Sequence, residues 1–187
     1  MRPDLPRALG SAVLVSGNPG KALEARRIVG AQLETAPLDL PEIQSLDLLE
    51  ILRFKAEEAW RRLERPLIVD ETALELGALN GFPGPLIKWM LQAVGPEGIA
   101  TTALALGETS AVARCALLYF DGTSEVVGEG TAPGAIVAPR GEGGFGWDPI
   151  FLPEGESKTY AELPSERKDL ISHRSHALKD LQRKLQA

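Results

Sequence analysis

The feature that most restricts the fold of this chain is a short apolar run that passes through a glycine loop into a helical pattern. Residues 12–16 have the uniform apolar character of a buried strand. Gly17-Asn-Pro-Gly20 then interrupts the pattern, and residues 21–29 have the spacing of a helix. A strand that runs through so short a loop into a helix is typical of proteins that mix the two elements in one layered fold.

The rest of the chain alternates further strands and helices. We expect helices over residues 46–63 with Ser45 as the N-cap, 85–94, 99–106, and a C-terminal region that ends at Leu185 and has N-caps at Ser165 and Ser172. We expect strands at residues 67–69, 111–120, 125–129, 135–138 and 150–152, with a hairpin turn at Asp121-Gly122. Because no repeat or linker separates these segments, the sequence predicts one α/β domain, residues 1–187, with a mixed sheet.

Charge and cysteine content exclude several kinds of partner. The 20 Lys and Arg residues against 26 Asp and Glu residues give a net charge of −6, which disfavours a nucleic acid or an anionic membrane as the main partner. The single cysteine, Cys115, cannot form an internal disulfide, so we expect a reducing compartment, the cytoplasm. Pro3, Asp4 and Pro6 precede an apolar run too short for a secretory signal, and no run approaches the ~20 residues of a membrane span.

The loop Ser16-Gly-Asn-Pro-Gly-Lys21 is a candidate phosphate site. It lies between a strand and a helix, where free backbone N–H groups, the helix dipole and a lysine can together bind phosphate oxygens. It differs from a Walker A loop, because two residues rather than four separate its glycines and Ala22 follows the lysine. An ordinary tight turn with an exposed lysine is the alternative.

A second glycine-rich loop, Gly141-Glu-Gly-Gly-Phe-Gly146, has the spacing of a dinucleotide fingerprint. Trp147-Asp-Pro149 follows it, and a proline there opposes the helix that the fingerprint must open, so we reject dinucleotide binding. The loop suits instead a close approach of the backbone to a ligand, with the rings of Phe145 and Trp147 as flat faces. A hairpin loop anchored by a core tryptophan is the alternative.

Two acidic residues, Asp70 and Glu71, follow the apolar strand at residues 67–69, and such strand ends commonly meet a ligand cleft. Paired carboxylates suit Mg²⁺, which typically binds one or two of them together with water and substrate phosphates. Glu42, in the loop Leu40-Pro-Glu-Ile43, is a candidate third carboxylate. The alternatives are a solvated strand end and an exposed loop acid.

Several basic side chains occupy positions unusual for surface residues. Lys55 lies on the apolar stripe of its helix and Lys88 in the apolar start of another, so both are predicted to face the interior or a cleft. The alternative for Lys55 is a side chain that snorkels at the edge of the stripe. Lys168, His173 and Arg174 add donors near the C-terminus, and for His173 the alternative is a position on the surface of a helix.

Five blocks of the chain, taken in order, resemble the signature of the inosine triphosphate pyrophosphatase family. They are Ser16-Gly-Asn-Pro-Gly-Lys21, Val69-Asp-Glu-Thr72, Gly81-Phe-Pro-Gly-Pro-Leu-Ile-Lys-Trp89, Phe145-Gly-Trp-Asp-Pro149 and Ser172-His-Arg174. The resemblance implies an elongated mixed β-sheet flanked by helices, two lobes around a central nucleotide cleft, and usually a homodimer. It also implies Mg²⁺-dependent hydrolysis of ITP, dITP and XTP to the monophosphate and pyrophosphate.

The resemblance further implies roles for individual residues. Ser16, Asn18 and Lys21 would hold the triphosphate, Lys55 would reach it, and Lys88 would line the cleft. Phe145, Trp147 and Asp148 would hold the base, with Lys168, His173 and Arg174 closing over it. The substrate-binding set also includes Gly17, Gly20, Thr72 and Gly146. Glu42 and Glu71 would bind the metal with help from Asp70, and catalysis would rest on Asp70, Glu71 and Lys55. The family usually has an aspartate where this chain has Glu71, so the division of roles between Asp70 and Glu71 stays open.

The expected reaction is an in-line attack of water at the α-phosphorus, with one acid of the Asp70/Glu71 pair orienting the water. Donors from His173, Arg174 or backbone N–H groups would favour the 6-oxo group of hypoxanthine and xanthine over the amino group of adenine. Two alternatives stay open: a nucleotide-binding sensor without turnover, and a pyrophosphatase for other damaged or pyrimidine nucleotides.

Overall fold

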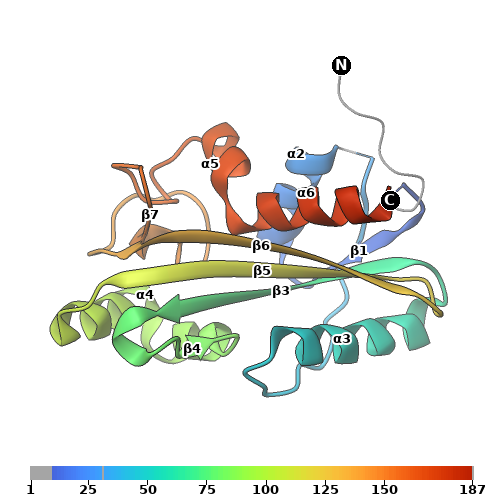
Figure 1. The fold of residues 1–187 in the computed structure, drawn as a ribbon, viewed down its shortest axis with the longest axis horizontal. Coiled ribbons are helices and arrows are strands. Elements are labelled where there is room, and N and C mark those ends of the chain that lie inside the picture. The colour runs from blue at the N-terminus through green and yellow to red at the C-terminus, as the bar shows by residue number, and fades with distance from the viewer. Residues whose placement is uncertain (1–9, 31, 187) are drawn as a thin grey trace.

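The computed structural model describes residues 10–30 and 32–186, and one long twisted sheet runs along its length (Figure 1). Its seven strands within these described ranges are β1 (Val13–Val15), β2 (Glu34–Ala36), β3 (Leu67–Leu76), β4 (Pro83–Gly84), β5 (Ser110–Phe120), β6 (Glu125–Ile136) and β7 (Phe151–Pro153). The helices are α2 (Pro19–Val29), α3 (Leu48–Leu63), α4 (Ile87–Leu106), α5 (Ser165–Ile171) and α6 (His173–Leu185). The strands lie in the order β2-β1-β3-β5-β6-β7, with β4 also paired to β3.

The sheet is mixed, as the sequence predicts. β1 runs parallel to β2 and β3, whereas β3, β5 and β6 form a long antiparallel meander. At the hairpin between β5 and β6, Asp121 Oδ1 accepts hydrogen bonds from the N–H groups of Thr123 and Ser124, which fixes the turn. The α/β fold class and this hairpin are therefore confirmed.

Helices cover both faces of the sheet. In Figure 1, α2, α5 and α6 lie on one face, and α3 and α4 lie on the other. Leu52 and Ala56 of α3 belong to the core on one face, and Leu178 and Leu181 of α6 belong to the core on the opposite face. The central strands β1, β3 and β5 are thus largely buried, while β6 is exposed at alternate positions.

Two glycines of β6 bring α6 unusually close to the sheet. A Cβ atom at Gly128 would lie 2.5 Å from the Cβ of Leu181, and one at Gly130 would collide with the backbone of His173 and Ala177. Only glycine leaves room for this approach. The contact fixes the first turn of α6, which carries His173 and Arg174, against the middle of the sheet.

The short lengths of β1 and β4 leave a gap beside β3. β1 pairs with β3 only at residues 67–69, and β4 pairs only with Leu74 and Glu75. Among the described residues, 70–73 of β3 therefore have no strand partner on this side. Side chains from both faces of β3 can reach the space that this gap creates.

The strands differ from the predictions in extent. β3 continues to Leu76, so Asp70 and Glu71 lie within a strand rather than at its end, and the predicted strand end is wrong. The sequence pattern failed there because charged groups on both faces of β3 are buried with partners. The three-residue edge strand β2 was not expected, and the predicted strand at 135–138 is the end of β6.

The helix starts differ in detail. α3 begins at Leu48 and its N-cap is Asp47, whose side chain accepts from the N–H groups of Leu49 and Glu50, so the assignment of Ser45 was wrong. Pro164 rather than Ser165 occupies the N-cap position of α5. The Ser172 cap of α6 is confirmed, since its hydroxyl accepts from the N–H of Ser175.

The two helices expected at 85–94 and 99–106 are both present within α4, one on each side of a non-helical residue. It bends at Gly95, which has a φ of 68°. No described helix combines the length and apolar character that a membrane crossing requires. The residues Pro3, Asp4 and Pro6, which entered the expectation about a secretory signal, lie outside the described residues.

Candidate active site

A cleft of about 470 Å³ opens at the gap beside β3. Its walls come from the β1–α2 loop, the segment 37–42, α3, β3, α4, the loop 145–148 and the start of α6. Every residue that the sequence predicts for the site lines this cleft except Gly20: Ser16, Gly17, Asn18, Lys21, Glu42, Lys55, Asp70, Glu71, Thr72, Lys88, Phe145, Gly146, Trp147, Asp148, Lys168, His173 and Arg174. Segments far apart in the sequence thus meet in one place.

The loop between β1 and α2 is shaped by Asn18. Its side-chain oxygen accepts from the N–H groups of Gly20 at 2.9 Å and Lys21 at 3.3 Å, while Pro19 starts the helix. These two N–H groups therefore already have a partner, which differs from the expectation of free donors. The dipole of α2 and the ammonium of Lys21 are the positive features that this loop presents to the cleft.

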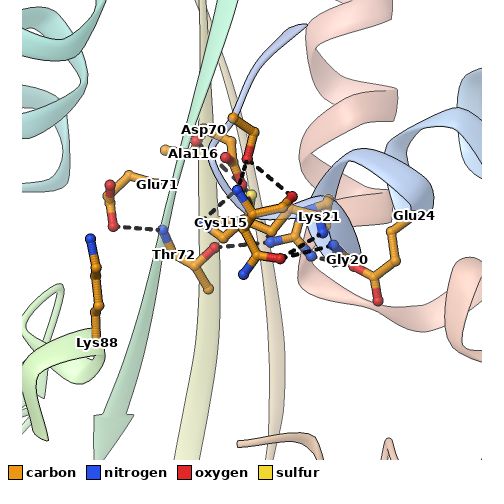
Figure 2. A network of polar contacts seen from close by, with 12 residues as sticks. Gly20, Lys21, Glu24, Asp70, Glu71, Thr72, Lys88, Cys115 and Ala116 are labelled. Carbon is orange, nitrogen blue, oxygen red and sulfur yellow. Dashed lines mark hydrogen bonds and ion pairs between the residues drawn. The ribbon is translucent and has the colours of Figure 1, made fainter. Parts of the chain in front are cut away.

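The adjacent acids of β3 point to opposite faces of the sheet, because side chains alternate along a strand. Asp70 and Thr72 face α6, where Nη2 of Arg174 lies 3.3 Å from Asp70 Oδ2 and donates to Thr72 Oγ1 at 3.1 Å. Glu71 faces the opposite way and accepts from Lys55 Nζ at 2.8 Å. Figure 2 shows Asp70 and Glu71 on opposite sides of β3. The two carboxylates are thus not a side-by-side pair.

A chain of buried charges lies on the α6 side of the cleft. Lys21 Nζ is 3.2 Å from Asp70 Oδ2, and Arg174 bridges Asp70 to Glu24. Burial raises the pKa of Asp70, but the charges of Lys21 and Arg174 outweigh it, so this pKa lies well below its usual range. Asp70 is therefore ionised throughout the neutral range.

Glu24 is a member of the site that the sequence analysis missed. It accepts from Arg174, and Lys168 Nζ lies 2.5 Å from its other oxygen and 2.6 Å from Asp148 Oδ2. Burial raises the pKa of Glu24, but the charges of Arg174 and Lys168 lower it by more than burial raises it. The pKa of Glu24 is therefore below its usual value. Its position three residues after Lys21, on the inner side of α2, was the available signal.

The α3 side of the cleft holds a second group of ion pairs. Lys55 Nζ donates to Glu71 at 2.8 Å and to the carbonyl of Asp70 at 2.9 Å, and lies 3.5 Å from Glu42 Oε1. Lys88 Nζ donates to the other oxygen of Glu42 at 2.8 Å. Burial lowers the pKa of Lys55, but the charges of Glu71 and Asp70 reverse this and raise it. Lys55 is buried and charged, as its stripe position predicts, while Lys88 is more exposed.

The ring of Phe145 covers the start of α2. A Cβ atom at Gly20 would lie 2.6 Å from this ring, so glycine is needed where the ring rests on the helix. Lys168 Nζ is 4.9 Å from the ring centroid. The loop itself is held by Asp148, which accepts from the N–H of Phe145 at 2.8 Å. Gly20 thus supports the site from beneath Phe145.

Trp147 belongs mainly to the core, since only 8% of it is exposed. Its ring lies 5.5 Å from that of Phe151 and 5.3 Å from that of His173, measured between centroids. The alternative of a loop anchored by a core tryptophan therefore describes most of its contacts, although one edge still lines the cleft.

His173 is 2% exposed, so the alternative of a surface position is wrong. Within the described part of the chain, neither ring nitrogen has a hydrogen-bond partner. Burial lowers the pKa of His173 far below its usual value, and the nearby charges of Arg174 and Lys168 lower it further. A neutral imidazole with unpaired polar atoms therefore borders the cleft.

The carboxylates of the cleft fit a magnesium site completed by substrate. Over the described residues, no three His, Cys, Asp or Glu side chains gather closely enough to form an all-protein cage. Mg²⁺ does not need such a cage, because it commonly takes one or two carboxylates and fills its shell with water and phosphate oxygens. Glu42 and Glu71, which share the ammonium of Lys55, are hard oxygen donors of this kind.

Comparison with known proteins shows close relatives over most of the chain. The sequence pattern of the Ham1 family matches residues 12–184. An inosine triphosphate pyrophosphatase of Yarrowia lipolytica is 41% identical over 176 residues, covering 91% of this chain and 93% of that protein. The inosine triphosphate pyrophosphatase of Batrachochytrium dendrobatidis is 42% identical over 172 residues, covering 90% of each. The structure of a HAM1 protein from Coxiella burnetii aligns with a TM-score of 0.78 at 27% identity, covering 94% of this chain and 98% of that one.

Proposed function

The chain belongs to the Ham1 family, and from that premise we propose that it is a nucleotide-pool hydrolase that converts ITP, dITP and XTP to the monophosphate and pyrophosphate. The observation that carries the proposal is one cleft lined by the loop with Lys21, by the carboxylates of Glu42 and Glu71, and by the ring of Phe145. Cations, hard oxygen donors and aromatic rings are the three chemistries that a metal-bound purine triphosphate requires.

The triphosphate end of the substrate is assigned to Ser16, Asn18, Lys21 and Lys55. Lys21 contacts Asp70 at 3.2 Å, and Lys55 contacts Glu71 at 2.8 Å. Phosphate oxygens would therefore compete with carboxylates for these ammonium groups. The exchange places positive charge beside the leaving pyrophosphate, where negative charge accumulates in the transition state.

Glu42 and Glu71 are the residues that would hold Mg²⁺, which when bound supplies positive charge to the phosphate oxygens. One acid of β3 orients the attacking water, whose oxygen joins the α-phosphorus. The bond from that phosphorus to the bridging oxygen breaks, pyrophosphate leaves, and the water's proton passes to the acid or to solvent. Because Asp70 and Glu71 point to opposite faces of β3, only the acid on the side of the α-phosphorus can serve.

The base end is assigned to the loop 145–148 together with Lys168, His173 and Arg174. His173 is neutral and has unpaired ring nitrogens, and Arg174 Nε is likewise buried without a partner in the described residues. Such donors suit the 6-oxo group of hypoxanthine or xanthine, whereas the amino group of adenine would leave them unpaired. A mismatch of that kind can cost up to ~10⁴-fold in kcat/KM.

We also propose a homodimer that works in the cytoplasm. Phe82 and Trp89, on either side of β4, are large apolar side chains that remain exposed, and such surfaces commonly mark protein interfaces. Cys115 is buried and free, which accords with a reducing compartment. The net charge of −6 is the reason that a nucleic-acid partner is not expected.

A panel of nucleoside triphosphates with Mg²⁺ tests the proposal, with product measured before and after added inorganic pyrophosphatase. ITP, dITP and XTP should turn over much faster than ATP, and orthophosphate should appear only with the added enzyme. Chelation by EDTA should abolish turnover, and Mg²⁺ should restore it. Tight ITP binding without product would identify a sensor instead, and preference for pyrimidine nucleotides would change the substrate class.

The variants Asp70→Asn and Glu71→Gln identify the acid that orients water. The amide keeps the shape of each side chain, and loss of the relevant carboxylate should lower kcat by ~10²-fold or more. Glu71→Asp should retain substantial activity, because it keeps the charge. Wild-type rates in both amide variants would remove the pair from the mechanism.

A further inference from the structure

The helix α5 has little apolar anchoring for an element that carries a residue of the site. Its only fully buried side chain is Lys168, which is 4% exposed. Leu170 is 60% exposed, and Ile171 is only partly buried against the core. Apolar packing of α5 is therefore limited, and ion pairs with neighbouring elements help to hold this helix in place.

Two reciprocal ion pairs join α5 to α2. Lys168 of α5 contacts Glu24 of α2 at 2.5 Å inside the protein. The next residue, Asp169, accepts from Arg27 of α2 through Nε at 2.7 Å and Nη2 at 3.0 Å. Each helix thus supplies one acid and one base, and the outer pair has the two-point geometry that fixes a guanidinium against a carboxylate.

We propose that Arg27 and Asp169 are a positioning pair that holds Lys168 in register between the two ends of the substrate site, an inference that rests on the function proposed above. Neither residue lines the cleft. Lys168, in contrast, contacts Glu24 on the phosphate-loop helix and Asp148 in the base loop. The Arg27–Asp169 pair fixes the backbone that carries Lys168 and thereby keeps the base loop aligned with α2.

The pair should affect substrate use more than folding stability. Surface ion pairs add little to stability, because solvent screens them. Small displacements of a positioning group can nevertheless cost a large factor in rate, up to ~10²-fold for a shift of ~1 Å. Lys168 is 4% exposed and its ammonium group contacts Glu24 at 2.5 Å and Asp148 at 2.6 Å, so a displacement of the α5 backbone shifts this group relative to both carboxylates.

The test uses Arg27→Ala, Asp169→Ala, their double variant, and the charge swap Arg27→Asp with Asp169→Arg. The matched control is Arg167→Ala, which removes another surface ion pair of the same helix, with Glu156 at 2.5 Å, that does not involve α2. Steady-state kinetics with ITP give kcat and KM, and thermal unfolding gives Tm. Labelling of Lys168 by an amine-reactive reagent, followed by mass spectrometry, reports its position without any substrate.

Each single variant should raise KM for ITP by about 10-fold with kcat within about twofold, and the double variant should be no worse than either. Lys168 should be labelled faster in the two single variants and in the double variant than in wild type. The charge swap should reverse at least part of the rise in KM and of the faster labelling. Arg167→Ala should resemble wild type in both measurements. The inference would be overturned if the Arg27 and Asp169 variants had the same labelling rate and KM as the control Arg167→Ala. It would also be overturned if the rises in KM of the two single variants added in the double variant. If the wild type did not turn over ITP, the proposed function would fail, and the labelling comparison would still decide the role of the pair.

Discussion

Acidification should destabilise the protein through His173. Burial and the charges of Arg174 and Lys168 keep the pKa of this histidine far below its usual value near 6.5. The unfolded chain therefore binds a proton as the pH falls below 6.5, while the native protein does not. Since the unfolded state then binds more protons, the free energy of unfolding decreases as the pH falls.

The size of the effect follows from proton linkage. One histidine of ordinary pKa in the unfolded chain, kept neutral in the native state, removes about 2 kcal/mol between about pH 7.5 and 5. The carboxyls with lowered pKa, including Asp70 and Glu24, act in the same direction but at lower pH, below about 4.5. Asp148, whose pKa is raised by burial, acts in the opposite direction.

Urea unfolding followed by tryptophan fluorescence at several pH values measures this loss. The chain has only two histidines, so His173→Asn should flatten the curve between pH 7.5 and 5, and subtraction from wild type isolates the contribution of His173. The control is His176→Asn, which alters an exposed position on α6 and retains the slope. A wild-type stability that is flat over this range, or an equal slope in His173→Asn, would refute the reasoning.

Two further predictions separate residues that bind substrate from residues that hold the fold. Lys21→Ala should raise KM for ITP strongly with little change in Tm. Lys55→Ala should also destabilise the folded protein by about 3–5 kcal/mol, because it leaves buried carboxylates unpaired. Urea unfolding together with ITP kinetics checks both variants, and equal stability of the two would contradict the assignment. Trp147→Ala should lose about 3–5 kcal/mol of stability, because its ring packs in the core, and a variant as stable as wild type would assign the ring to the ligand alone.

The residues that the sequence analysis selected meet in one cleft, and they could be selected because their signals are local. The loop from Ser16 to Lys21 is marked by glycine and proline between a strand and a helix, and it forms that turn in the structure. Lys55 interrupts an apolar stripe, and it is buried among carboxylates. Each of these departures from an ordinary pattern is visible without knowledge of the fold.

What the sequence could not supply depends on partners from distant segments. Glu24 looks like any polar residue of a helix until Arg174 and Lys168 approach it from α6 and α5. Asp70 and Glu71 suggested a strand end, because two adjacent acids are buried within a strand only when cationic side chains contact both faces of that strand. Lys55 and Arg174 provide those cations, and neither contact is local in sequence.

The position of water attack tests the central claim most directly. A single turnover of ITP in ¹⁸O-labelled water, analysed by mass spectrometry, shows which product receives the solvent oxygen. Attack at the α-phosphorus predicts the label in the monophosphate and none in pyrophosphate. Label in pyrophosphate, or in orthophosphate released together with the diphosphate, would contradict the proposed chemistry of this cleft.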